Sequence, residues 1–274
     1  MRKNKTLYVS DLDGTLLNSN QSISDFTAQV INNMVEKGMV FTYATARSAY
    51  TACPKTSAIK GNIPLIIYNG VFIINNETGE KMLSSYFNQE QVQEIKSVLD
   101  MHGIYPIVYS FIDNREKFSF CINNMSRGIR DFTSTRENDE RRNEIIDLTN
   151  LYKGENFYYT CIDDKEKLLF AYDKLKNKYR CIFSKDIYSN DYWLEIMPKG
   201  ATKANAVLKL KEMLGCDKIV SFGDNVNDIE MFKISHECYA VENAVDELKE
   251  YATGIIESND NDGVAKWLNE NAGL

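Results

Sequence analysis

The sequence is poor in the residues that build most metal clusters, disulfide frameworks and stiff linkers. Its two histidines, His102 and His236, offer little material for a zinc cluster or for histidine-based phosphoryl transfer. The six cysteines include no Cys-x-x-Cys pair, so we expect buried, reduced thiols. There are only four prolines, and no Pro-rich or Gly/Ser-rich linker divides the chain. Chemistry in this protein must therefore rest on carboxylates, lysine and hydroxyl groups.

The sequence also lacks long hydrophobic runs and an excess of basic residues. The apolar stretch 63–68 is followed directly by Asn69-Gly70 and is far shorter than the ~20 residues that cross a bilayer. The basic N-terminus leads into an apolar segment too short for the core of a signal peptide, so we expect a cytoplasmic protein with no membrane partner. Its 32 Lys and Arg against 39 Asp and Glu give a net charge of −7, which disfavours broad binding of nucleic acid.

What the chain does have is an ordinary globular composition over 274 residues, with 43% hydrophobic and 26% charged residues. The β-branched and aromatic residues 7–9 predict a short buried strand. Ser22 and Ser24 offer N-caps for an amphipathic helix that Gly38 can end, and 39–44 is typical of a second strand. This strand, helix, strand order predicts parallel strands in a sheet that is covered on both faces.

From about residue 87 the pattern changes to a mixture of helical and strand segments rich in aromatic residues. Helices are predicted over 89–101, 139–148 and 165–175, with a solvated helix start in the charged run 136–142, and strands over 104–110, 118–122, 156–162 and 180–184. After 192–197 the parallel α/β pattern returns. We therefore predict an α/β, Rossmann-like parallel-sheet core formed by residues 1–85 and 191–274, with an α+β domain inserted at 86–190.

Four short polar constellations lie at predicted strand ends or helix starts. They are Asp11-Leu12-Asp13-Gly14-Thr15, Ala44-Thr45-Ala46-Arg47, Lys199-Gly200-Ala201-Thr202-Lys203 and Gly223-Asp224-Asn225-Val226-Asn227-Asp228. Ligands of open α/β sheets bind outside the carboxyl ends of the strands. We therefore expect three of the four to converge on one crevice, and Lys203 to reach it.

Such a group of side chains suits phosphoryl chemistry. Asp11 and Asp13, two positions apart at a strand end, can project into one crevice, and Asp224 would complete the set. Crowded carboxylates repel one another, and oxygen-only ligands with no nearby histidine favour Mg²⁺ as the neutralising cation. With Lys203 opposite and the Thr45 hydroxyl between, the site would receive a phosphoryl group, and a carboxylate could attack it.

Each constellation alone has a plainer interpretation. Asp-x-Asp-Gly-Thr is also typical of a turn that ends a strand, and the acidic cluster at 223–228 is typical of a helix N-cap. Thr45 alone could be a core or capping hydroxyl, and Lys203 alone could lie on a solvated helix face. Only their joint appearance in this order favours a catalytic site.

With these motifs together, the chain resembles the haloacid dehalogenase (HAD) superfamily of phosphatases, specifically the type IIB group of Cof-like sugar phosphatases, over essentially its full length. The resemblance rests on residues 11–15, Thr45, Asn69-Gly70, Lys203 and residues 223–229. It implies a HAD core with an inserted α+β cap domain of type IIB. Asp11 would then attack phosphorus, while Asp13 would protonate the leaving oxygen and later activate water.

The resemblance also implies the ligands of the metal and of the phosphoryl group. One Mg²⁺ would be held by the Asp11 carboxylate, the Asp13 backbone carbonyl and the Asp224 carboxylate. The phosphoryl oxygens would be held by the side chains of Thr45, Lys203 and Asn227. The backbone N–H groups of Leu12 and Ala46 would also donate to them. Asp228 is expected to be a partner of Lys203 or of the metal-bound waters.

One position departs from the family pattern, because the usual Thr-Gly-Arg is Thr45-Ala46-Arg47 here. Alanine keeps the backbone donor but restricts φ, so phosphate should still bind if this residue needs no left-handed conformation.

The sequence therefore predicts a Mg²⁺-dependent phosphatase of small phosphorylated metabolites, with sugar phosphates favoured, acting as a monomer or small homo-oligomer. A phosphoryl transferase or mutase on sugar phosphates, and a non-catalytic phosphometabolite sensor, stay open as alternatives.

Overall fold

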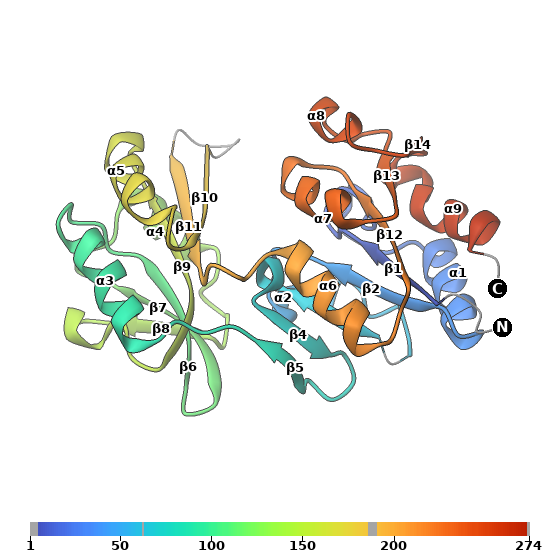
Figure 1. The fold of residues 1–274 in the computed structure, drawn as a ribbon. Coiled ribbons are helices and arrows are strands. Elements are labelled where there is room, and N and C mark those ends of the chain that lie inside the picture. Colours follow the sequence, from blue (N-terminus) through green and yellow to red (C-terminus); the bar gives the residue numbers. More distant parts are fainter. Residues whose placement is uncertain (1–4, 62, 186–190, 273–274) are drawn as a thin grey trace. The chain divides into compact units, whose positions relative to one another are not determined.

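The computed structural model describes residues 5–61, 63–185 and 191–272 of the chain, which divides into two compact units (Figure 1). The first unit joins Met1–Ser84 to Ala201–Leu274, and the second is Ser85–Gly200. Residues 191–200, predicted in the core, thus fall in the second unit. The reason is that strand β11 (Tyr192–Met197) pairs antiparallel with its neighbours in the second unit's sheet.

The first unit contains an eight-stranded sheet in the order β14-β13-β12-β1-β2-β3-β4-β5. Six of these strands are parallel: β1 (Thr6–Ser10), β2 (Val40–Ala44), β3 (Pro64–Ile67), β12 (Lys218–Gly223), β13 (Glu237–Val241) and β14 (Gly254–Ile256). The edge hairpin β4 (Phe72–Asn75) and β5 (Lys81–Ser84) is antiparallel. The predicted parallel strand pair is confirmed, and the two chain segments of the unit meet where β1 pairs with β12.

Helices α1 and α9 of the first unit pack against each other, as do α6 and α7. The unit's helices are α1 (Asp25–Glu36), α2 (Ala49–Ala52), α6 (Lys203–Met213), α7 (Ile229–Ile234), α8 (Asp246–Lys249) and α9 (Gly263–Asn271). Of the two serines predicted to cap α1, Ser24 does so, accepting the Thr27 N–H at 3.0 Å. Gly38, at φ 99°, allows the left-handed conformation with which the chain leaves the helix.

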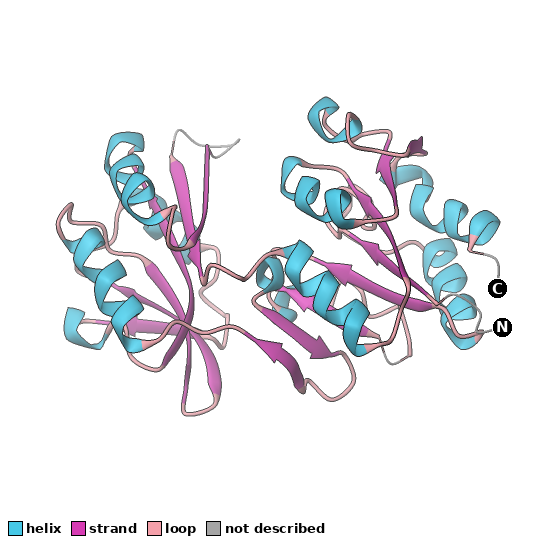
Figure 2. Cartoon of the chain, in the orientation of Figure 1, coloured by secondary structure: helices cyan, strands magenta, loops and turns pink. Residues whose placement is uncertain are grey.

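The second unit is a six-stranded sheet in the order β10-β11-β9-β6-β7-β8, with helices on both faces (Figures 1 and 2). Its further elements are α3 (Gln89–Asp100), β6 (Ile107–Ile112), β7 (Arg115–Cys121), α4 (Arg127–Ser134), β8 (Arg142–Ile145), β9 (Glu155–Asp163), α5 (Lys165–Leu175) and β10 (Arg180–Lys185). Consecutive residues of a strand face opposite sides of a sheet. Cys161 therefore packs with α3 and α5, while Ile162 packs with α4.

The prediction of a helix over 139–148, with a helix start at 136–142, is wrong. Residues 142–145 form strand β8, which pairs in parallel with β7. The charges that suggested a solvated helix form ion pairs instead, because buried Arg141 binds Glu116 of β7 at 2.7 Å and its near neighbour Asp139 at 2.6 Å. These contacts hold the segment against the sheet and override its local helical pattern.

All six cysteines are free, and Cys121, Cys161, Cys216 and Cys238 are buried. Within the described ranges, no helix combines the length and the apolar character that crossing a bilayer requires.

Candidate active site

The carboxyl ends of the adjacent strands β1, β2 and β12 bring three of the predicted constellations to one edge of the sheet. Ser10, the last residue of β1, pairs with Tyr43 of β2 and Phe222 of β12. The next residue, Asp11, continues the ladder by donating its N–H to the Phe222 carbonyl at 2.9 Å. Asp11 therefore stands at the centre of this edge, and its residue is only 5% exposed.

Lys203 reaches this centre from the first turn of α6. Its ammonium group donates hydrogen bonds to the Asp11 carboxylate and, at 2.7 Å, to that of Asp228. Gly70 allows this placement: it has φ 97°, and a Cβ atom there would collide with the Thr202 carbonyl and approach the Lys203 nitrogen. The Asn69-Gly70 turn thus fixes the start of the helix that carries the lysine.

Asp228 and Asp224 have different surroundings. Asp228 is fully buried and accepts hydrogen bonds from Lys203 and from the N–H groups of Asp224 and Asn225, both at 3.2 Å. Asp224 accepts one from the Thr15 hydroxyl at 3.1 Å. Asp228 is thus committed to protein donors and orients the loop, whereas Asp224 keeps acceptor capacity for a ligand.

Burial and mutual repulsion shift the pKa values of these groups. Burial raises the pKa of Asp11, and the carboxylates of Asp228 and Asp224 raise it further, against the opposing charge of Lys203. Burial and Asp228 raise the pKa of Asp224 to about 6. For Lys203, burial lowers the pKa, but the charges of Asp11 and Asp228 outweigh it and leave the pKa raised. One lysine does not fully compensate this cluster, so a further cation is favoured.

The cluster fits a hard divalent cation. Carboxylate oxygens of Asp11, Asp224 and Asp228 lie within 4.8 Å of one another. Gly14, at φ 78°, leaves room beside Asp224, since a Cβ atom there would lie 2.5 Å from its Oδ2 atom. Because Asp228 already accepts three hydrogen bonds, Asp11 and Asp224 are the carboxylates best able to face an ion. An all-oxygen set of this kind suits Mg²⁺.

The predicted phosphate-binding residues lie beside this cluster. Buried Thr45 accepts the Arg47 N–H at 3.1 Å, so its hydroxyl hydrogen can point to a ligand. Ala46 is exposed and lies outside the positive-φ region, so alanine fits where the family has glycine. The side chain of Leu12 is buried in the core. The buried Oδ1 of Asn227 has no hydrogen-bond partner within the described part of the chain, so this acceptor is open to a donor such as water.

Asp13 lies apart from the carboxylate cluster, and three residues that the predictions gave no role support the site. The Asp13 carboxylate binds Arg47 in a two-point ion pair. Thr15 binds Asp224, and the side-chain amide of Asn243 donates to the Gly14 carbonyl at 2.8 Å. Arg47 and Thr15 stand inside recognised motifs, so their proximity to the site could have been read from the sequence. Asn243 belongs to no such motif and is brought in only by the fold.

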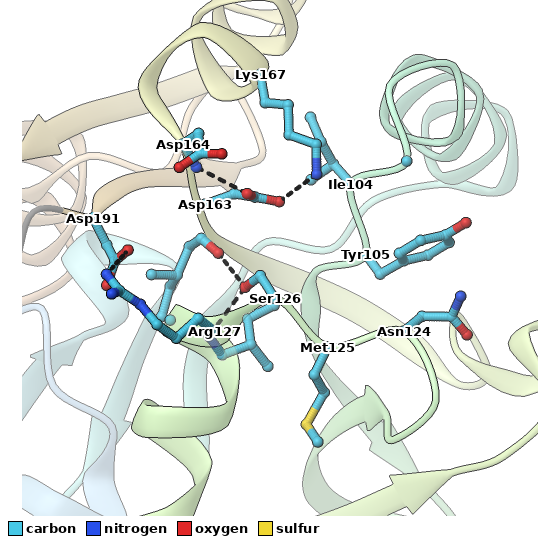
Figure 3. Close-up of a pocket in the computed structure, with 14 residues that line it drawn as sticks. Ile104, Tyr105, Asn124, Met125, Ser126, Arg127, Asp163, Asp164, Lys167 and Asp191 are labelled. Atoms are coloured by element: carbon cyan, nitrogen blue, oxygen red, sulfur yellow. Dashed lines mark hydrogen bonds and ion pairs between the residues drawn. The ribbon is translucent and has the colours of Figure 1, made fainter.

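The second unit has a polar cavity of its own, of about 400 Å³, at the N-terminal ends of α4 and α5 (Figure 3). Four of its charged groups form two ion pairs, Arg127 with Asp191 at 2.9 Å and Lys167 with Asp163 at 2.8 Å, and Asp164 adds a further carboxylate. Tyr105 also lines the cavity, on the side away from Asp191 (Figure 3). This lining suits a polar ligand better than an apolar one.

Comparisons with known proteins identify the family and the fold. A model of the haloacid dehalogenase-like hydrolase family matches residues 8–268. The 5-amino-6-(5-phospho-D-ribitylamino)uracil phosphatase YwtE of Bacillus subtilis is 30% identical, over 95% of this chain and 96% of its own. A solved haloacid dehalogenase-like hydrolase from Bacteroides thetaiotaomicron is 25% identical, with a TM-score of 0.78 over 98% of this chain and 99% of its own. The HAD subclass IIB sugar phosphatase BT4131, 19% identical, shares the fold, with a TM-score of 0.73 over 98% of this chain and 100% of its own.

The family match covers both segments of the core and the inserted unit. The protein is therefore of the class of hydrolases with a parallel α/β core and an inserted α+β cap domain. The chain belongs to the haloacid dehalogenase-like hydrolase family, and it is a phosphatase. The predicted family and fold class are thereby confirmed.

Proposed function

We propose that the protein is a Mg²⁺-dependent phosphomonoesterase that acts on small phosphorylated metabolites, sugar phosphates first, through an aspartyl phosphate on Asp11. The observation that carries the proposal is the buried contact of Lys203 with Asp11, beside Asp224. A buried carboxylate held by a lysine can act as a nucleophile, and the lysine can then stabilise charge on the phosphoryl oxygens.

The reaction divides into two steps. First, an Asp11 oxygen forms a bond to phosphorus while the bond from phosphorus to the leaving oxygen breaks, and Asp13 gives that oxygen a proton. Second, water attacks the phosphorus of the aspartyl phosphate, Asp13 takes the proton of the water, and phosphate leaves with Asp11 restored. Mg²⁺ held by the Asp11 and Asp224 carboxylates and the Asp13 backbone carbonyl would supply positive charge next to the phosphoryl oxygens.

The remaining site residues hold the phosphoryl group in place. Lys203, the Thr45 hydroxyl and the Asn227 amide are proposed to donate to its oxygens, together with the N–H groups of Leu12 and Ala46. Asp228 acts through Lys203, which it binds at 2.7 Å.

Two relatives guide the choice of substrate. YwtE and YitU of Bacillus subtilis, 30% and 23% identical to this chain, are both named as phosphatases of 5-amino-6-(5-phospho-D-ribitylamino)uracil. This phosphorylated compound therefore belongs in a substrate panel beside sugar phosphates, nucleotides and cofactor phosphates.

The test is phosphate release across this panel by the wild type and by Asp11→Asn, each with Mg²⁺ and with EDTA. We expect release by the wild type that disappears in the variant and under EDTA. Asp25→Asn, which removes an exposed carboxylate on α1, is the matched control and should behave as the wild type. Full activity of Asp11→Asn would refute the proposal. Turnover only with an acceptor sugar would indicate a transferase, and ligand binding without turnover would indicate a sensor.

A further inference from the structure

Two hydrogen bonds hold the backbone of Arg47 in place. Its N–H donates to the Thr45 Oγ1 at 3.1 Å, and its carbonyl accepts the Tyr68 N–H at 2.9 Å. Its side chain is 21% exposed. Because its backbone is held and its side chain is largely buried, few rotamers are open to Arg47.

The guanidinium group of Arg47 grips the Asp13 carboxylate with two parallel hydrogen bonds. Nε donates to Oδ2 at 2.7 Å, and Nη2 donates to Oδ1 at 2.5 Å. Nη2 also lies 3.4 Å from the Gln21 side-chain oxygen, which accepts from Lys55 at 2.8 Å. A two-point bond of this kind fixes both the plane and the direction of a carboxylate.

The stability of the fold does not account for this ion pair. The Asp13 side chain is 45% exposed, and ion pairs at such exposed positions add little to the stability of a fold. Among the residues that the structure describes, Arg47 is the one whose side chain hydrogen-bonds the Asp13 carboxylate. Without Arg47, the half-exposed Asp13 side chain would be free to change rotamer. The ion pair therefore serves to orient the Asp13 carboxylate.

We propose that Arg47 is a positioning residue for the proton transfers of Asp13. The inference rests on the proposed function, in which Asp13 gives a proton to the leaving oxygen as the bond from that oxygen to phosphorus breaks. Arg47 exchanges no proton and forms no bond to phosphorus. It keeps the carboxyl group of Asp13 at the place from which the proton is transferred.

The dependence of the rate on the leaving group tests this role. An alkyl phosphate needs a proton on its leaving oxygen, whereas p-nitrophenyl phosphate releases a stable anion and does not. We expect Arg47→Ala to lower kcat/KM for the alkyl ester roughly 10- to 100-fold, and for the aryl ester less than about threefold. Arg47→Lys, which keeps the charge but loses the two-point grip, should restore only part of the alkyl rate.

A double-mutant cycle ties the effect to Asp13. In an Asp13→Asn background, Arg47→Ala should cause no further loss that depends on the leaving group. Lys266→Ala, which breaks the 2.5 Å ion pair with Glu257 in the same unit, should leave both rates unchanged, and unfolding midpoints verify that every variant is folded.

Three results would overturn the inference. Unchanged rates in Arg47→Ala would show that Asp13 needs no support. Equal losses on both esters, with a raised KM and weaker inhibition by inorganic phosphate, would show that Arg47 binds the phosphoryl group instead. A wild type that hydrolyses neither ester would overturn the proposed function, and this inference with it.

Discussion

Lys203 balances the two buried carboxylates of the site, so its removal tests their energetics. Breaking a buried ion pair leaves uncompensated charge and costs about 3–5 kcal/mol. Lys203→Met should therefore lower the free energy of unfolding, measured by urea titration without metal, by about this amount, and should also abolish phosphate release. The side chain is 3% exposed and hydrogen-bonds both Asp11 and Asp228, so water cannot replace it readily.

Lys209→Met is the matched control on the same helix. The Lys209 side chain is 61% exposed and lies 3.2 Å from Glu212 on the surface, so its loss should change stability by less than about 0.5 kcal/mol. If both variants unfolded at the same urea concentration as the wild type, the buried charges would not depend on Lys203.

At the scale of single residues, the sequence signals are strongest where phosphoryl chemistry demands one type of side chain. Asp11, Asp224 and Lys203 carry strong signals because their types and spacing suit phosphoryl transfer, and the structure places them together. The ion pair of Arg47 with Asp13 could not be read from spacing. It depends on the directions of two side chains in the loops that follow β1 and β2, which only the folded backbone sets.

At the scale of elements, strand β11 carries a titratable group at an unusual place. Glu195 lies on the face opposite to Leu194 and Ile196, is half-buried, and accepts the Tyr158 hydroxyl at 2.5 Å. Burial raises the pKa of Glu195 above its ordinary 4.5, although the Tyr158 hydrogen bond opposes this shift. The ionised carboxylate is therefore less favourable in the folded unit than in the unfolded chain.

This shift predicts how the stability of the second unit depends on pH. Because the pKa of Glu195 is higher in the folded state, the protonated group contributes to the stability of the fold. This contribution is fully present below the pKa of the unfolded chain, near 4.5, and is lost as the pH rises through the pKa of the folded state. Glu195→Gln keeps an oxygen that can accept from Tyr158 but cannot ionise. Urea unfolding from pH 4 to pH 8 should show the variant gaining stability over the wild type as the pH rises.

An exposed carboxylate of the same unit provides the control. Glu137→Gln removes a charge from the turn before β8 and should give a curve parallel to that of the wild type. If the difference between Glu195→Gln and the wild type stayed constant across this range, Glu195 would have the same pKa in both states.

Elements with local signals are predicted better than elements held by tertiary contacts. The helix expected over 89–101 is found as α3 (Gln89–Asp100), which begins with a capping box formed by Asn88 and Gln91. The sequence predicts a helix where strand β8 lies, because buried and exposed residues alternate only weakly along β8 and its pairing with β7 is a long-range contact. The sequence predicts that the second unit ends before residue 191, but the structure ends it at Gly200. The reason is that β11 pairs with strands of the second unit, and long-range pairing of this kind cannot be read from the sequence.

At the scale of the whole molecule, each unit carries one of the two tryptophans, which makes the units separately observable. Trp267 lies on α9 in the first unit and contacts Phe222 and Tyr239, while Trp193 lies on β11 and contacts Phe132. Trp193→Phe therefore leaves a fluorescence probe of the first unit, and Trp267→Phe leaves a probe of the second.

Metal binding should stabilise the two units unequally. A ligand that binds only the folded state adds RT ln(1 + [L]/Kd), or about 2.7 kcal/mol at a hundredfold excess over Kd. The proposed ligands Asp11 and Asp224 both belong to the first unit. Thermal unfolding followed by Trp267 should therefore shift to higher temperature with Mg²⁺, and unfolding followed by Trp193 should shift less. Asp224→Asn should abolish the shift, and NaCl at equal ionic strength should not reproduce it.

The outcome also decides whether the phosphatase unfolds as one body. Each unit buries its own apolar side chains, such as Leu7 and Val9 in the first and Tyr159 and Leu194 in the second, which favours two transitions. If both probes reported one midpoint, and Mg²⁺ raised it equally for each, the two units would unfold together and the metal would stabilise the entire chain. If Mg²⁺ raised neither midpoint while phosphate release still required it, the ion would bind too weakly to stabilise the fold without substrate.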